Sequence, residues 1–374
     1  MPDETPLTPI LHRTIAEQGP LPIAEYMMLC LTHPQHGYYT TGSPVGGRAS
    51  AEREGGDFIT APEISQMFGE MIGVWCMEVW QALGEPAAFS LVEIGPGRGT
   101  LMRDLLRVAD ALPGFKKAAQ VHLVEVSPTL AEQQSLLLTP TNTSLRWIGD
   151  IDALPDQPAI IIANELLDAL PFRQWVKQGE AWHERAVGLG EGKLTFVTRP
   201  NTLRLASLPA GHENEPEGMI FETSPAREGF IARLAHWLNA HNGAALFLDY
   251  GHLKTGFGDT FQAVRDHAHV DVLSSPGRCD LTSHVDFAPL TTIAREAGCA
   301  VPPPVTQGDF LLDLGLLERA GNLGSGREAH IQEALRSAVE RLAGPQHMGT
   351  LFKAIAFGAP ASLGERWPGF TPKG

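Results

Sequence analysis

Short apolar runs alternate with segments of helical spacing over much of this chain. The strand-like runs span residues 91–94, 121–126, 144–148, 158–163, 244–249 and 349–357. Runs that are apolar throughout are typical of strands buried on both faces of a sheet. Their alternation with helices predicts an α/β fold, with a parallel sheet between two layers of helices.

The same pattern divides the chain into three regions. Residues 1–88 form a helical and loop-rich region, which we expect to cover the active site. Residues 89–255 hold the core of the sheet, with a β-hairpin insertion near 172–200, where polar and apolar residues alternate. Residues 256–374 add an insertion, further helices and the C-terminal strand that completes the sheet.

The spacing of apolar residues supports two local expectations. Helical spacing extends over about 5–30 and again from Pro62 through Val74, where Thr60 is a candidate N-cap. By contrast, the segment 251–282 shows no sustained period, so we expect it to be mostly irregular.

The run LVEIGPGRGT (91–100) carries the strongest chemical signal in the sequence. A buried strand breaks into Gly95, Gly97 and Gly99 and opens onto a helix, and glycines let the backbone approach a ligand closely. Glu125 ends the next strand-like run, where a carboxylate suits the diol of a ribose. The spacing is G-x-G-x-G rather than the G-x-G-x-x-G of dinucleotide enzymes. These features predict a nucleoside cofactor and favour S-adenosylmethionine over NAD.

Polar residues also follow the later strand-like runs. Asp150 can accept a hydrogen bond from an adenine amino group while the backbone N–H of Ile151 serves a ring nitrogen; an Asx-turn is the alternative. Asn164 and Glu165 end another run, and Asp168 follows within one turn. Such groups can hold a cationic nucleophile or bind the amino-acid end of the cofactor. Asn164 as an N-cap, with Glu165 in the first turn of a helix, is the alternative.

Further carboxylates precede the glycine turn. Asp57 lies in a glycine-rich stretch, and Glu63 and Glu70 are spaced by two helical turns, which would place them on one helix face. Several carboxylates near a cofactor suit a guanidinium, which presents five donors in a fixed fork. Solvated charge on a helix face is the alternative.

Composition narrows the choice of partners and compartment. The net charge of −15 over 374 residues argues against nucleic acid and anionic membranes and is compatible with a basic substrate group. No apolar run reaches the roughly 18 residues of a membrane span, and the N-terminus has no signal-like core. The four scattered cysteines form no C-x-x-C, so we expect reduced thiols in a cytoplasmic protein without a metal site.

With these residues assembled, the chain resembles the MidA-like class I methyltransferases, a family that includes the mitochondrial complex I assembly methyltransferase. The resemblance extends from about His33 to Gly358. Its motifs are GDFITAPEISQMFGE (56–70), EIGPGRG (93–99), ANELLDALP (163–171), DYGH (249–252), QAVR (262–265), DLT (280–282), VDF (285–287), QGDF (307–310) and MGTLFK (348–353).

The resemblance implies a Rossmann-like class I sheet, S-adenosylmethionine bound at the glycine turn and Glu125, and methyl transfer to a protein. The mitochondrial relative forms symmetric dimethylarginine on a complex I core subunit, so a respiratory complex I subunit is the implied partner. Segments 43–54 and 201–217 are the expected departures from the family, and either can reshape the substrate entrance.

We therefore expect a cytoplasmic S-adenosylmethionine-dependent protein methyltransferase directed at arginine. Transfer is an in-line displacement, so catalysis rests on positioning and on electrostatic control of the nucleophile. The candidate catalytic residues are Glu165, Asp57, Glu63, Glu70 and Asp168. The candidate cofactor-binding residues are Glu93, Gly95, Gly97, Gly99, Glu125, Asp150, Ile151 and Asn164.

Two alternatives of other classes stay open at this point. One is a nucleotide-dependent oxidoreductase, which the G-x-G-x-G spacing disfavours. The other is a non-catalytic assembly factor that keeps a nucleoside pocket but acts by binding a partner. Whether the protein forms a homodimer is also left open.

Overall fold

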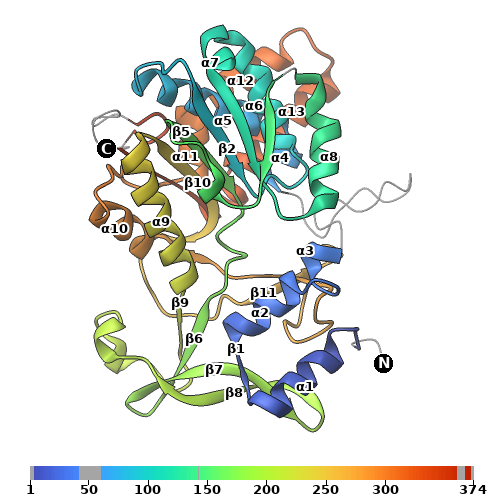
Figure 1. The fold of residues 1–374 in the computed structure, drawn as a ribbon, viewed down its shortest axis with the longest axis vertical. Coiled ribbons are helices and arrows are strands. Elements are labelled where there is room, and N and C mark those ends of the chain that lie inside the picture. Colours follow the sequence, from blue (N-terminus) through green and yellow to red (C-terminus); the bar gives the residue numbers. More distant parts are fainter. Residues whose placement is uncertain (1–3, 42–59, 142, 360–366, 372–374) are drawn as a thin grey trace. The chain divides into compact units, whose positions relative to one another are not determined.

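The computed structural model describes residues 4–41, 60–141, 143–359 and 367–371 and forms two compact units (Figure 1). The described residues of Met1–Phe58, Leu167–Gly229 and Lys254–His284 form the first unit. Those of Ile59–Leu166, Phe230–Leu253 and Val285–Gly374 form the second unit. Segments far apart in the sequence thus fold together, and the expected region 1–88 contributes to both units.

The second unit contains the α/β sheet that the apolar runs predict. In the described residues its strand order is β15-β16-β10-β5-β2-β3-β4, with β14 beside β10. Strands β4, β3, β2, β5 and β10 are parallel, whereas β16 is antiparallel to both β10 and β15. The strands are β2 (Phe89–Ile94), β3 (Ala119–Val124), β4 (Leu145–Ile148), β5 (Ala159–Asn164), β10 (Ala244–His252), β14 (Val285–Asp286), β15 (Val305–Thr306) and β16 (Phe352–Gly358). The predicted α/β fold class is confirmed.

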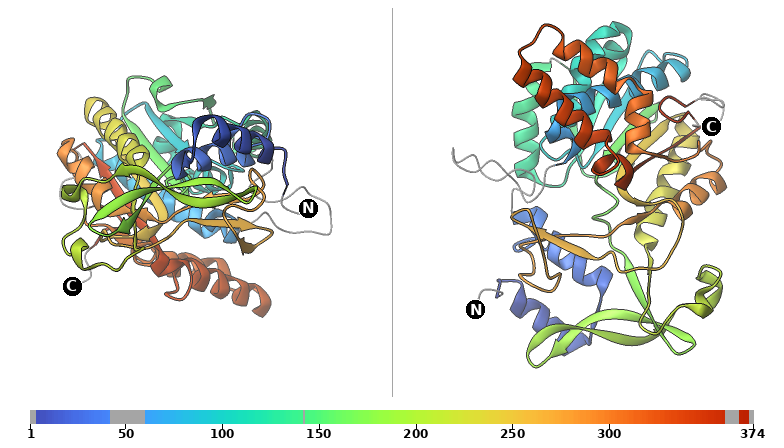
Figure 2. Two further views of the ribbon diagram at one scale, coloured as in Figure 1. Left: turned by 90° about the horizontal axis from the view of Figure 1, so that it is seen from below. Right: turned by 180° about the vertical axis from the view of Figure 1, so that it is seen from behind.

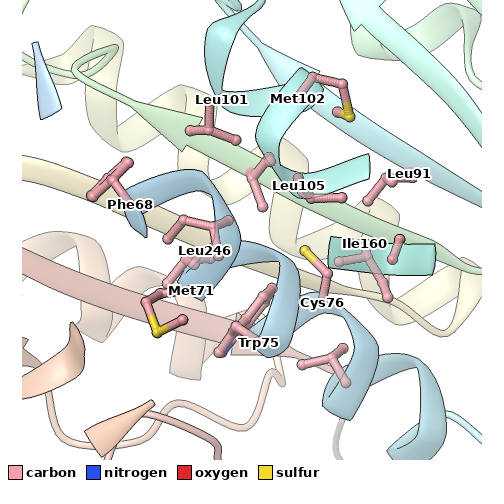
Figure 3. Packing of buried hydrophobic residues seen from close by; sticks show 14 of the residues in the cluster. Phe68, Met71, Trp75, Cys76, Leu91, Leu101, Met102, Leu105, Ile160 and Leu246 are labelled. Atoms are coloured by element: carbon pink, nitrogen blue, oxygen red, sulfur yellow. The ribbon is translucent and has the colours of Figure 1, made fainter. Parts of the chain in front are cut away.

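Helices cover both faces of this sheet because alternate strand residues point to opposite sides. Leu91, Ile160 and Leu246 belong to a core cluster shared with α5 and α6 (Figure 3), whereas Phe247 stacks on Phe357 and meets Phe230 of α9 edge-on. Helices α12 and α13 lie side by side (Figure 2). The helices that contribute to this unit are α4 (Ala61–Ile64), α5 (Gln66–Ala82), α6 (Thr100–Val108), α7 (Pro113–Ala118), α8 (Pro128–Leu138), α9 (Pro225–His241), α10 (Phe287–Glu296), α11 (Gln307–Asp313), α12 (Leu316–Gly324), α13 (Ala329–Ala343) and α14 (Met348–Leu351), with short 3-10 turns at Ala109–Ala111, Thr139–Thr141 and Ile151–Ala153.

Two glycines on α5 allow this helix to approach α6 closely. A Cβ at Gly69 would lie 2.9 Å from the Leu101 carbonyl oxygen, and one at Gly73 would lie 3.2 Å from the Leu105 carbonyl oxygen. Both distances are shorter than an ordinary van der Waals contact, so larger residues would push the helices apart. This packing matters for the site because α6 begins directly after the glycine turn.

The first unit is built from antiparallel strands and N-terminal helices. One sheet has the order β1-β7-β6-β9 with β8 beside β7, and a second has the order β12-β11-β13. The elements are α1 (Thr8–Gln18), β1 (Leu21–Pro22), α2 (Ile23–Thr32), α3 (Tyr38–Thr41), β6 (Arg173–Gln178), β7 (Ala181–Gly190), β8 (Lys193–Thr202), β9 (Ile220–Thr223), β11 (Gln262–Arg265), β12 (Ala268–Val270) and β13 (Asp280–Thr282), with 3-10 turns at Leu205–Ser207 and His212–Asn214. The predicted hairpin is therefore the centre of a larger sheet. Segment 251–282 is mostly irregular, as expected, but it also contains the short strands β11, β12 and β13, which the sequence pattern does not indicate.

Two expected helices are each divided in two. Gly19, with a φ of +84°, ends α1 before the short strand β1. Ser65 is extended, with φ −162° and ψ 143°, and its hydroxyl accepts a hydrogen bond from the Met67 N–H at 3.2 Å, so it caps a new helix. Thr60 makes no side-chain capping bond. The predicted continuous helix from Pro62 through Val74 is therefore wrong.

Candidate functional site

The parallel strands of the second unit place several chemically suited residues at one edge of its sheet. Backbone hydrogen bonds fix the residues that follow the strands: Gly95 N–H donates to Val124 O at 3.1 Å, and Glu125 N–H donates to Ile148 O at 3.0 Å. Because the strands are parallel, their carboxyl ends meet at this edge, where open α/β sheets bind ligands.

The glycine turn connects β2 to α6 as the sequence predicts. Gly95, Gly97 and Gly99 have φ values of +67°, +52° and +83°, a region that L-residues rarely adopt. Gly99 is the N-cap residue of α6, and its carbonyl oxygen accepts the Arg103 N–H at 3.0 Å. The turn therefore exposes backbone at a helix N-terminus, where unpaired N–H groups attract negatively charged ligand groups.

Glu93 lies buried beneath this turn. The Met102 N–H in the first turn of α6 donates a hydrogen bond to its carboxyl group, and burial raises the pKa of Glu93 to about 8. Its second oxygen, Oε2, has no hydrogen-bond partner among the described residues. An ammonium group of a ligand would donate a hydrogen bond to this oxygen and stabilise the ionised carboxylate, which burial alone disfavours.

Glu125 is held in place by two donors. Its Oε1 accepts the Ser127 N–H at 2.8 Å, and its Oε2 accepts Nε2 of Gln134 at 3.0 Å. A carboxylate can accept about four hydrogen bonds, so this group can still receive the two hydroxyls of a ribose. Gln134 was not among the sequence candidates. The one signal for it is its spacing on α8, where it occupies a buried position between Leu130 and Leu138.

Asp150, which follows β4, forms the Asx-turn that the sequence analysis gives as the alternative to adenine binding. Asp150 caps the short turn Ile151–Ala153 by accepting the Asp152 N–H at 3.0 Å, and its other oxygen lies 3.3 Å from Nη2 of Arg233. Asp150 is exposed, whereas Ile151 is buried. A role of either residue in holding adenine stays a prediction.

Asn164 and Glu165 end β5 in an unusual backbone conformation. Glu165 has a φ of +50°, and its Oε1 accepts Nδ2 of Asn164 at 3.0 Å and the Ala61 N–H at 3.4 Å. Oδ1 of Asn164 is buried without a partner among the described residues. The chain forms turns rather than a helix over 165–170, so the capped-helix alternative is wrong. A non-glycine residue held at positive φ costs about 1–3 kcal/mol, and such strained residues cluster at active sites and ligand-binding sites.

The other predicted acidic residues are dispersed. Asp57 lies outside the described residues. Asp168 is buried in the first unit, where its carbonyl oxygen accepts the Ser283 N–H at 3.2 Å. Glu63 accepts the Thr100 hydroxyl at 2.6 Å and lies 3.9 Å from Nη1 of Arg98, so its carboxylate joins α4 to the glycine turn.

Glu70 has a different environment from the one predicted. Its side chain is 1% exposed, and its oxygens accept hydrogen bonds from Arg107 at 3.1 Å and from Arg319 at 2.8 Å. Because the helix is interrupted at Ser65, Glu70 and Glu63 do not share one continuous helix face. A carboxylate that already binds two guanidinium groups cannot receive a third from a substrate. We therefore correct the predicted catalytic role of Glu70 to a structural one.

Replacing Glu70 with alanine is expected to lower the free energy of unfolding by about 2–4 kcal/mol, because removing one partner of a buried ion pair leaves the others uncompensated. Arg107 and Arg319 are 42% and 33% exposed and can rehydrate, which limits the loss. Urea denaturation is the measurement, and the exposed Glu78 on the same helix gives the control Glu78→Ala. If the expected methyl-transfer activity fell without a loss of stability, the predicted catalytic role of Glu70 would be supported instead.

The described residues show few features of a metal site, a membrane span or a disulfide framework. They contain no group of three or more His, Cys, Asp or Glu residues that could hold a metal ion. They also contain no helix that is long and apolar enough to cross a membrane. All four cysteines are buried, and none forms a disulfide.

Comparisons with known proteins identify the family to which this chain is similar. A family model described as an S-adenosyl-L-methionine-dependent methyltransferase matches residues 71–305. The mitochondrial protein arginine methyltransferase NDUFAF7 of Xenopus tropicalis is 36% identical over 91% of this chain and 82% of its own. Human NDUFAF7 is 35% identical over 95% of this chain and 84% of its own. A crystal structure of a Burkholderia thailandensis protein bound to S-adenosyl-homocysteine superposes with a TM-score of 0.81, at 27% identity, over 96% of this chain and 94% of the other.

These findings decide three expectations. The similarity to proteins that use S-adenosylmethionine or hold its product confirms the predicted cofactor. They favour a methyltransferase over both the oxidoreductase and the non-catalytic assembly factor. The expected cytoplasmic location is contradicted, because the NDUFAF7 relatives are mitochondrial proteins. The match to the family model and the identity with NDUFAF7 over nine-tenths of the chain show that this protein is an enzyme of the MidA-like family of S-adenosylmethionine-dependent methyltransferases.

Proposed function

We propose that this enzyme transfers a methyl group from S-adenosylmethionine to an arginine side chain of a partner protein. The observation that carries the proposal is the 35–36% identity, over 91–95% of the chain, with proteins named as protein arginine methyltransferases. A subunit of respiratory complex I is the partner that the family resemblance implies.

We propose that the amino-acid end of the cofactor lies over the glycine turn. Support comes from the buried, unpartnered oxygens of Glu93 and Asn164, which belong to the neighbouring parallel strands β2 and β5. An ammonium group would supply hydrogen bonds to both. The left-handed turn at Gly95 and Gly97 keeps Cβ atoms out of the space that the cofactor would need.

The nucleoside is proposed to lie along the ends of β3 and β4. Glu125 would accept the ribose hydroxyls, and Asp150 with the Ile151 N–H would face the adenine edge. Val126 was not a sequence candidate, but it directly follows Glu125 and is 79% exposed. An exposed apolar side chain at this position offers a surface that an adenine ring would cover.

Glu165 is the residue that we propose to act on the substrate nucleophile. The bound cofactor supplies a methyl group activated by a positively charged sulfur. A guanidinium nitrogen is a weak nucleophile because its electrons are delocalised, and a carboxylate that binds the guanidinium draws the positive charge away from the attacking nitrogen. Attack forms the N–C bond as the S–C bond breaks, and the proton on that nitrogen leaves to solvent. The fixed position of Glu165, through Leu248 O, Asn164 and Ala61, supports this role.

Replacing Glu165 with glutamine is expected to lower kcat by about 100-fold or more, because the charge is removed while the shape is kept. Affinity for S-adenosyl-homocysteine should change by less than about threefold, since the residue acts on the nucleophile rather than on the cofactor. Single-turnover transfer of a labelled methyl group and calorimetric titration measure the two quantities. Glu296→Gln, at an exposed position on α10, is the control. A parallel fall of rate and affinity would move Glu165 from the substrate site to the cofactor site.

A further inference from the structure

One buried amide links the glycine turn to the carboxylate at the end of β3. Gln134 on α8 is fully buried, and its Nε2 donates to Gly97 O at 2.8 Å and to Glu125 Oε2 at 3.0 Å. Its Oε1 accepts Nε1 of Trp147, on β4, at 2.8 Å. Both N–H groups and the oxygen of this side chain are therefore used.

The orientation of this amide is fixed by chemistry. The Trp147 indole N–H can only donate, so the group that faces it must be the amide oxygen of Gln134. The NH₂ group must then face the glycine turn and Glu125. These two neighbours are a carbonyl and a carboxylate, both acceptors, and only a group with two donors can satisfy them together.

The helix that carries Gln134 also packs on the turn itself. A Cβ placed at Gly99 would lie 3.4 Å from Cγ of Gln134. The side chain thus contacts the turn by packing at one glycine and by a hydrogen bond at another. Since it also bonds Glu125, movement of either cofactor-binding element relative to the other would break one of these contacts.

We propose that Gln134 is a positioning residue for S-adenosylmethionine, which sets the spacing between the glycine turn and the ribose-binding carboxylate. This role rests on the proposed placement of the cofactor at Gly97 and Glu125. Gln134 orients the groups that touch the cofactor and takes no part in methyl transfer. The indole N–H of Trp147 in turn fixes the orientation of the Gln134 amide.

The variant Gln134→Met tests this role, because methionine has a similar length but lacks both donors. Calorimetric titration of the full chain with S-adenosyl-homocysteine should show affinity weaker by at least about tenfold, as expected for losing a hydrogen bond to a charged group at a fixed site. The KM for S-adenosylmethionine should rise by a similar factor, while kcat at saturating cofactor stays within about threefold of wild type. Gln133→Met is the matched control, because Gln133 is the exposed neighbour on the same helix.

The variant Trp147→Phe provides a second, independent test of this role. It removes the indole donor but keeps the aromatic ring, so affinity should fall less than in Gln134→Met. The double variant should bind no more weakly than Gln134→Met alone, because both changes break one hydrogen-bonded chain. In the cofactor-free protein, the indole N–H resonance that is lost in Trp147→Phe should shift in Gln134→Met. This resonance reports on the hydrogen bond between Trp147 and Gln134 even if one variant is too unstable for kinetic measurements.

Two results separate the possible failures. If Glu125→Ala weakens binding but Gln134→Met binds as well as Gln133→Met, the positioning role of Gln134 is overturned while the proposed site stands. If Glu125→Ala also binds normally, the placement of the cofactor itself is wrong. If the losses of affinity in the double variant were additive, Trp147 and Gln134 would act independently. That result would contradict the proposal that the hydrogen bond between them orients the amide.

Discussion

Replacing Gly97 with valine is expected to weaken binding of S-adenosyl-homocysteine by at least about 100-fold, beyond detection in a calorimetric titration. Gly97 has a φ of +52°, which a β-branched residue adopts only with strain of about 1–2 kcal/mol. Relief of that strain would turn the Gly97 carbonyl away from Gln134. The new side chain would also occupy space that we assign to the cofactor. Methyl transfer should be lost with binding.

The matched control for this change is Gly84→Val. Gly84 lies beyond the C-terminal end of α5 with a φ of +84°, and a Cβ there would meet no atom within 4 Å. The two variants therefore introduce similar backbone strain and should lose similar stability. Only Gly97→Val should lose the cofactor. Unchanged affinity in Gly97→Val, at equal folding, would contradict the proposed location of the site.

Replacing the target arginine with lysine in the partner protein is expected to eliminate methylation. An arginine side chain keeps its charge and presents a planar fork of donors that matches a carboxylate. A lysine amine must lose a proton before it can attack, and a neighbouring carboxylate such as Glu165 would stabilise its protonated form instead. Intact-mass and peptide spectra of the partner, after incubation with enzyme and S-adenosylmethionine, are the measurement.

An arginine elsewhere in the same partner gives the control for this experiment. Its replacement by lysine should leave methylation of the target unchanged. Methylation of the introduced lysine at a rate near that of arginine would refute guanidinium selectivity. It would leave the methyltransferase activity of the family in place.

The architecture of the second unit was predictable because its strands are parallel and buried on both faces. Such strands are continuous apolar runs, and the glycine turn after β2 has a local signature. Features that depend on distant partners were not predictable. Strand β11 pairs Gln262 with Thr282 of β13, and no periodicity within 251–282 indicates that pairing. The break at Ser65 was likewise missed, although serine is a favoured N-cap.

The site shows the same division between local and distant signals. The glycine turn and Glu125 can be proposed as cofactor-binding residues from the sequence because each follows a strand directly. The spacing from Glu63 places Glu70 at the rim in the sequence analysis. Its ion pair with Arg319 could not be predicted, because the two residues are 249 positions apart and nothing near Glu70 in the sequence indicates that contact. Gln134 was missed because it is a single polar residue in a helix. Its role is visible only when α8, the turn and β4 are brought together.

Methylarginine on respiratory complex I subunits is the most direct test of the central claim, that this family member methylates arginine with the cofactor bound at the glycine turn. Peptide mass spectrometry would compare host cells that carry the wild-type protein, the Gly97→Val variant or the Gly84→Val control. We expect methylarginine at one site with wild type and with Gly84→Val, and unmodified arginine at that site with Gly97→Val. The same methylarginine in all three strains, or methyl-lysine with arginine unmodified, would contradict the account.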